Sequence, residues 1–250
     1  MSGHSKWSTI KRKKGALDAK RGKVFSKLAK EITVAARLGG GDPLMNPRLR
    51  TVLLAARAEN MPKDNVERAI KKGTGEIEGV NYEEQRYECY GPSGVGIIVD
   101  TLTDNKNRTV SEVRHTVSKH GGSMAEANAV MWNFSSKGRI TVDKAGLTDD
   151  EIFEKASEAG AEDVDMEGDM YEIITELGDL HAVAAALEAM KITPKEAKPT
   201  LIPKTTIEVE GKALSAMLKI IETLEDNDDI QDVYTNIEFS EEALEAVMAD

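Results

Sequence analysis

Residues 139–202 follow an order of strands and helices that restricts the chain to few folds. Short β-type runs and amphipathic helices alternate there as strand, helix, strand, strand, helix, strand. The pattern places them at 139–142, 149–159, 163–166, 171–175, 180–190 and 199–202. This order is typical of the ferredoxin-like split βαβ unit, a four-stranded sheet with two helices on one face. The sequence therefore predicts an α+β domain in this segment.

The segments on either side of this unit complement each other. Strands are expected at 85–90, 95–102 and 130–134 and a helix at 108–120. After the central unit come a short strand, a helix and a further strand, which can complete the earlier set. We therefore predict a second ferredoxin-like α+β domain at 79–135 plus 204–250, with residues 136–203 inserted in it as a third domain. A linear series of domains is the alternative.

The first 78 residues carry helical signals alone and are predicted to form a separate domain. A long amphipathic helix is expected at 17–38, ended by Gly39. Asn46-Pro47 supplies a cap and a first-turn proline for a second helix, and a short third helix follows. Before them, residues 1–14 lack both acidic residues and an apolar stretch, which is typical of an arm that orders on binding. The predicted fold class is α+β, with an N-terminal three-helix domain before two ferredoxin-like domains.

Charge is divided sharply along the chain. Residues 1–75 hold 18 Lys and Arg against 6 Asp and Glu, a net charge of +12, whereas residues 76–250 hold 15 against 38, a net charge of −23. Such asymmetry indicates a nucleic acid or another polyanion as partner of the basic part. A solvated basic face that aids solubility is the alternative.

The predicted phosphate contacts lie in the arm and on one face of the long helix. At 100° per residue, the lysines of this helix gather opposite its apolar stripe. The candidate contacts are Lys6, Lys11, Arg12, Lys13, Lys14, Lys20, Lys23, Lys27 and Lys30. Contacts of this kind hold and orient a nucleic acid without reading its sequence. The helix-turn-helix order of this domain could also place its third helix in a major groove, although any three-helix bundle has such a corner.

A second anion site is predicted at the start of helix 108–120. Asp104 or Asn105 can cap this helix, and Lys106 and Arg108 then lie near its free N–H groups. Ordinary capping with exposed charges is the alternative. The two possibilities have equal weight.

Sequence patterns for catalysis, metal binding and membrane insertion are lacking. The nucleophile elbow and phosphate-loop spacings fail, and one cysteine with four scattered histidines offers no metal-ligand spacing. We therefore predict no catalytic residue, no metal, no cofactor and no membrane partner, and expect a monomer in a reducing cytoplasm, where Cys89 is a buried structural thiol. Trp132 and Phe134 share one face of the expected strand 130–134, and core packing is favoured over a role in base stacking.

Several motifs resemble the YebC family. They include Gly3-His4-Ser5-Lys6-Trp7, the run Gly39-Gly40-Gly41-Asp42-Pro43 with Asn46-Pro47-Arg48-Leu49-Arg50, Tyr90-Gly91-Pro92, and Asp104-Asn105-Lys106-Asn107-Arg108-Thr109. The resemblance runs from the N-terminus to the final acidic stretch. It implies three domains, the first helical and the others α+β. Bacterial members are described as transcriptional regulators that bind DNA, and mitochondrial relatives as translational activators. The resemblance carries no site residue.

Charge and resemblance together predict a non-enzymatic regulator of gene expression that binds nucleic acid. Transcriptional regulation through DNA is the first interpretation. The alternative is a ribosome-associated translation factor that binds ribosomal RNA or tRNA, since phosphate contacts suit DNA and RNA equally.

Overall fold

The computed structural model describes residues 17–249, with side chains from Gly22 to Met248. Contacts divide the chain into two compact units. The first unit contains Asn81–Ser135 and the chain from Ile202 onward, and the second contains the described part of Ala16–Val80 together with Ser136–Leu201. The predicted boundaries near residues 78, 135 and 203 stay a prediction.

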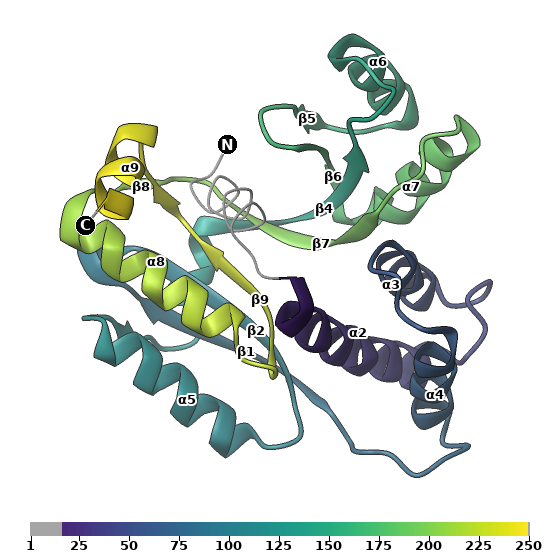
Figure 1. The fold of residues 1–250 in the computed structure, drawn as a ribbon, viewed down its shortest axis with the longest axis horizontal. Coiled ribbons are helices and arrows are strands. Elements are labelled where there is room, and N and C mark those ends of the chain that lie inside the picture. The colour runs from purple at the N-terminus through teal and green to yellow at the C-terminus, as the bar shows by residue number, and fades with distance from the viewer. Residues whose placement is uncertain (1–16, 250) are drawn as a thin grey trace. The chain divides into compact units, whose positions relative to one another are not determined.

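Three helices occupy the N-terminal part of the second unit (Figure 1). They are α2 at Leu17–Gly39, α3 at Pro47–Ala58 and α4 at Lys63–Thr74. α2 packs against both other helices. The apolar stripe predicted for the long helix forms their shared core, where Ile32 and Ala35 are buried against Leu49 and Ala69. α2 extends through Gly39, and Gly40 takes the left-handed conformation with a φ of 85°.

A four-stranded sheet forms the first unit. Its strands are β1 at Glu83–Tyr90, β2 at Gly96–Thr103, β3 at Ser123–Met124 and β9 at Ile230–Thr235, in the order β3-β1-β2-β9. Each strand is antiparallel to its neighbour. Two helices, α5 at Lys106–Lys119 and α8 at Gly211–Glu225, pack together on one face. A small parallel pair, β8 at Ile207–Glu208 and β10 at Ile237–Glu238, and the helix α9 at Glu241–Ala249 complete the unit.

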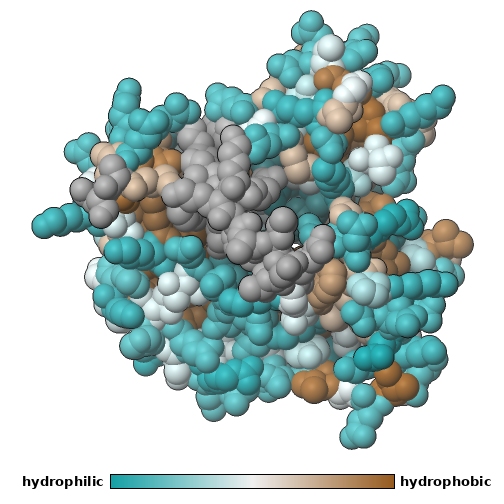
Figure 2. Space-filling view, viewed as in Figure 1, coloured by the Kyte–Doolittle hydropathy of each residue, from teal (hydrophilic) through white to brown (hydrophobic). Residues whose placement is uncertain are grey.

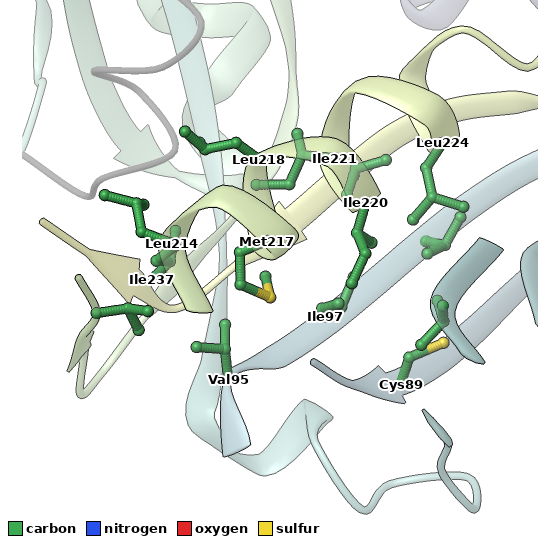
Figure 3. Packing of buried hydrophobic residues seen from close by; sticks show 14 of the residues in the cluster. Cys89, Val95, Ile97, Leu214, Met217, Leu218, Ile220, Ile221, Leu224 and Ile237 are labelled. Carbon is green, nitrogen blue, oxygen red and sulfur yellow. The ribbon is translucent and has the colours of Figure 1, made fainter. Parts of the chain in front are cut away.

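The core of the first unit lies between this sheet and α8. Met217 and Ile221 of α8 are fully buried, as are Val95, Ile97 and Cys89 at the sheet (Figure 3). Apolar positions on α8 recur at three and four residues, so one stripe of the helix meets the sheet along its length. The burial of about a dozen such side chains is the main favourable term for this unit.

The sheet of the first unit has a ferredoxin-like order in space but a different order along the chain. β2 leads through α5 to the edge strand β3, β1 lies between β2 and β3, and β9 follows α8 on the far side of β2. In a ferredoxin-like domain the strand at the position of β1 would follow β3 in sequence. Here it precedes β2 as one arm of a hairpin, so the same layers arise from a permuted connection.

The second unit also contains a sheet, which is the one predicted for residues 139–202. The strands are β4 at Phe134–Asp143, β5 at Asp163–Asp165, β6 at Met170–Glu176 and β7 at Glu196–Pro203, in the order β5-β6-β4-β7. The helices α6 at Asp149–Ala159 and α7 at Leu180–Ala189 connect them. This is the ferredoxin-like strand order, and Ile140, Ile152 and Ile173 lie in its core. The predicted α+β fold class is confirmed.

The expected strand at 130–134 is wrong. Met131–Asn133 form a 3₁₀ turn, and Phe134 is the first residue of β4. The cause is Glu88, whose carboxylate accepts hydrogen bonds from the backbone N–H groups of Asn128 (2.6 Å), Val130 (2.6 Å) and Met131 (2.9 Å). These amides are therefore not available to a strand partner.

We call Ala125–Asn133 the tryptophan loop. Glu88 and Tyr90 alternate with the core residue Cys89 on β1, so they point to the face of the sheet opposite the helices. The Tyr90 hydroxyl and the Trp132 indole Nε1 both donate to the Ala129 carbonyl oxygen at 2.9 Å. The indole of Trp132 nevertheless stands in solvent, 67% exposed. Core packing of Trp132 is thus a wrong expectation, whereas Phe134 is buried.

Candidate nucleic-acid interface

Three exposed cations gather on α4. Arg68, Lys71 and Lys72 lie three and four residues apart, which places their side chains next to one another on one face of the helix. Val66 and Ile70 face the helical core instead. Among the residues that the structure describes, no ion pair joins these three cations to a carboxylate. They are therefore available to a polyanion.

The neighbouring helices extend this positive charge. Residues 22–75 hold 11 Lys and Arg against 5 Asp and Glu, a net charge of +6 without any part of the arm. Two of the carboxylates are neutralised locally, because Arg48 contacts Glu31 at 2.7 Å and Lys63 contacts Glu67 at 3.5 Å. The positive balance thus remains after these pairs are set aside.

The structure locates part of the predicted phosphate contacts. Lys23 is exposed on α2, Lys27 and Lys30 are half-buried, and all three take part in further interactions. Of Lys20 only the backbone, within α2, is described. The arm residues Lys6, Lys11, Arg12, Lys13 and Lys14 lie outside the described residues. The lysine face of α2 therefore stays a prediction, and the described structure adds the α4 cluster to it.

The cations of the predicted second anion site are both held by carboxylates. The Lys106 ammonium lies 2.5 Å from Glu83. Arg108 donates to the buried Asp229 at 2.5 Å and to Asp104 at 2.7 Å. Their hydrogen bonds raise the pKa of Arg108 above its ordinary value. A bound anion would have to displace these partners, which tie the start of α5 to the start of β9. The second anion site stays a prediction.

Capping of α5 and the burial of Asp229 belong to one network. The Asn105 side chain accepts from the Arg108 N–H at 3.1 Å, which caps the helix as predicted. Asp229 also accepts from the Thr109 hydroxyl at 2.9 Å. A buried carboxylate is stable only when paired and hydrogen-bonded, and here both conditions hold.

Other candidate chemical groups are few in the described part of the chain. Burial, together with the charge of Glu88, raises the pKa of Cys89 to about 12, so this thiol is unreactive at neutral pH. No cluster of three His, Cys, Asp or Glu side chains that could hold a metal occurs among residues 22–248. None of the described helices has the length and apolar character that a membrane span requires. On the face shown in Figure 2, hydrophilic side chains predominate and apolar ones form separate small patches.

The cations on α4 could not be singled out from the sequence. Every Lys and Arg of the basic segment carries the same charge, and only the fold shows which ones pair with carboxylates. The spacing of Arg68, Lys71 and Lys72 was the available signal, because it is the spacing of neighbours on one helical face.

Comparison with known proteins finds matches along almost the whole chain. A family model described as the TACO1/YebC protein N-terminal domain matches residues 5–76, and one described as the TACO1/YebC second and third domain matches residues 82–237. A protein of Desulfatibacillum aliphaticivorans, named a probable transcriptional regulatory protein, is 58% identical over 244 residues, which are 98% of this chain and 99% of its own. A protein of the same name from Desulfosudis oleivorans is 56% identical over 246 residues, 98% of this chain and 100% of its own.

A solved structure agrees with these matches. The crystal structure of a conserved hypothetical protein from Aquifex aeolicus resembles this chain with a TM-score of 0.87 at 44% sequence identity, covering 92% of this chain and 95% of that one. Both family models, the near-full-length relatives and the shared fold lead to one conclusion: the chain belongs to the TACO1/YebC family.

Proposed function

We propose that this protein is a non-enzymatic regulator of gene expression that binds duplex DNA through its N-terminal helices. The observation that carries the proposal is the α4 cluster of Arg68, Lys71 and Lys72, exposed in a region of net positive charge. The names of the relatives, which describe transcriptional regulators, support it. Clustered cations bind a phosphate backbone because they release its condensed counterions.

The negative charge of the first unit repels a nucleic acid. Residues 81–135 and 202–249 hold 8 Lys and Arg against 19 Asp and Glu. A polyanion is therefore drawn to the helices and repelled from the first unit. Phosphate contacts alone fix position and leave the base sequence unread.

A ribosomal RNA target is the second candidate. Phosphate contacts suit an RNA backbone as well as a DNA one, and folded RNA is recognised largely through its shape and backbone. Asp64 and Glu67, exposed on the first half of α4, repel the phosphates of either nucleic acid and so do not separate the two candidates.

The proposal is tested by the salt dependence of binding. Replacing Arg68, Lys71 and Lys72 by Gln should weaken duplex binding and reduce the slope of log K against log salt by about 2 to 3, at roughly 0.9 per lost phosphate contact. A matched variant makes the same charge change in the first unit, at the exposed Arg114, Lys119 and Lys219. It should leave the slope unchanged. An equal or larger loss in the matched variant would move the interface to α5 and α8.

The target is identified by crosslinking in cells followed by sequencing of the bound nucleic acid. Enrichment of promoter DNA supports the first candidate. Enrichment of ribosomal RNA, lost in the α4 variant and kept in the matched variant, would replace it with the second. Recovery of neither nucleic acid would reject both.

A further inference from the structure

Two apolar side chains project from the loop between α2 and α3. We call Gly39–Asn46 the leucine–methionine loop. Leu44 and Met45 are each 79% exposed, more than any other large apolar side chain that the structure describes, and Leu38 just before the loop is 66% exposed. Adjacent large apolar groups held in water mark a binding surface more often than scattered single ones do.

The loop that carries them is fixed by one buried side chain. The Asn46 amide nitrogen donates to the carbonyl oxygens of Ala35 and Gly40, each at 2.8 Å, and its oxygen accepts from the Leu49 N–H at 3.0 Å. Asn46 thus ties the end of α2 to the start of α3. A side chain at Gly39 would lie 2.6 Å from this amide, so the loop requires glycine there.

A tight turn at the tip directs both side chains outward. The Asp42 carboxylate accepts from the Leu44 N–H at 2.9 Å, and the Asp42 carbonyl oxygen accepts from the N–H groups of Met45 and Asn46 at 3.1 and 3.0 Å. The backbone amides of the tip are therefore satisfied inside the loop. What the tip offers to a partner is its apolar surface, with little conformational freedom left to lose.

The charges around the tip select the class of partner. Three arginines lie in the segment from Arg37 to Arg50, and the one carboxylate there, Asp42, is engaged by the tip itself. Arg48 pairs with Glu31, so the charge of the whole helical segment decides: residues 22–75 hold 11 Lys and Arg against 5 Asp and Glu. A positively charged surrounding favours a polyanion. In a polyanion such as DNA the apolar surface lies between stacked bases, and proteins reach it with Leu, Met, Ile, Phe or Pro side chains that part a base step.

We propose that Leu44 and Met45 form a wedge that inserts between two base pairs of bound duplex DNA and kinks it. The inference rests on the proposed function, because the helical domain must first hold the duplex. It adds a source of selectivity that phosphate contacts lack: flexible pyrimidine–purine steps open more easily than stiff ones, so the wedge prefers sites that contain them.

The test places 2-aminopurine, a base whose fluorescence rises when it is unstacked, next to a TpA step in a short duplex. Binding of the full-length protein should raise the fluorescence several-fold and shorten the distance between dyes at the duplex ends. Replacing both residues together, Leu44→Ser with Met45→Ser, should abolish both changes. It should lower affinity by about tenfold, because the apolar burial lost is partly offset by the unstacking avoided. The salt slope should stay the same.

A matched variant, Phe153→Ser with Leu177→Ser, removes two other exposed apolar side chains and should behave as the unchanged protein. Unchanged fluorescence in a complex that still forms and depends on salt would overturn the wedge alone. Fluorescence that rises only in a duplex RNA of the same sequence would overturn the assignment to DNA. No binding to the duplex even at low salt would overturn the proposed function with it.

Discussion

The leucine–methionine loop and the tryptophan loop are each fixed by a buried polar side chain, but the two side chains differ. Each holds large apolar groups in solvent on a backbone that is fixed from beneath by one buried polar residue. Under the first loop lies Asn46, a neutral amide, and under the second lies Glu88, a carboxylate.

The difference follows from what each side chain can bind. An amide both donates and accepts, so Asn46 joins two carbonyl oxygens and one N–H group. An ionised carboxylate only accepts, so Glu88 gathers three N–H groups that converge from one turn. The first arrangement does not depend on pH, whereas the second requires Glu88 to be charged. Each loop therefore responds differently to substitution and to acid.

The largest effect is expected at Asn46. Asn46→Ala removes the cap of α3 and leaves the buried Leu49 N–H without its partner, which should lower the local stability of α3 by about 3 kcal/mol. Native-state hydrogen exchange of the α3 amides measures this change, because it reports local opening in a chain of several domains. The loss should be the same at neutral and acidic pH.

Gly39→Ala provides the control for that effect. Its methyl group would displace the Asn46 amide, so the double variant should lose little more than Asn46→Ala alone. Additive losses of α3 stability would show that Gly39 and Asn46 act independently. That result would contradict the role of Asn46 in fixing the loop.

An intermediate effect, with a pH dependence, is expected at Glu88. Its three backbone hydrogen bonds outweigh burial and lower the pKa of Glu88 below the ordinary value of 4.5. A folded pKa below the unfolded one stabilises the protein above pH 4.5, and this stabilisation is lost as the pH falls through the folded value. Glu88→Gln should therefore cost about 2 kcal/mol near neutral pH, and the gap to the unchanged protein should narrow in acid.

Trp132 emission during urea unfolding measures this gap in a chain that also carries Trp7→Phe, which leaves one tryptophan. Comparing the two proteins at each pH removes the contribution of the other carboxylates. A gap that stays constant from about pH 6 to pH 3 would contradict the role given to the ionised Glu88.

The smallest effects on stability are expected at the exposed apolar groups themselves. Two variants test this: one combines Leu44→Ser with Met45→Ser, and the other is Trp132→Ser. Loss of the apolar side chains should change the unfolding free energy of each variant by less than about 0.5 kcal/mol, since these side chains are already in water. Trp132→Ser also loses a hydrogen bond to Ala129 and should lie at the upper end. Phe134→Ala, two residues further along the chain and buried, should instead cost about 3 kcal/mol. Thermal unfolding of the variants side by side checks the ranking.

Local signals in the sequence predicted the elements well where capping chemistry is explicit. Thr148 and Glu151 form a capping box at the start of α6, and the predicted range 149–159 matches the helix. Asn46-Pro47 likewise fixed the start of α3. The strand expected at 130–134 does not form, because Glu88, some forty positions earlier, binds the amides that a strand would use. Nothing local to that segment shows this contact.

The candidate interface was predictable as a region but less so as a set of residues. The concentration of Lys and Arg before residue 75 is a property of the sequence. Whether a given cation is engaged depends on carboxylates that folding brings near, as Asp229 is brought to Arg108. For the same reason the α4 cluster emerged only once its neighbours were placed.

The pairing of β2 with β9 has a consequence for how the protein is made. Gly96 donates its N–H to the Asn236 side chain, 140 positions later. Contacts between such distant residues form late, because a long loop must first close. During synthesis, the backbone N–H and C=O groups at this edge of β2 therefore lack their hydrogen-bond partners until almost the entire polypeptide has left the exit tunnel. A shortened product that stops before residue 230 would keep that edge open and would be prone to associate with other chains.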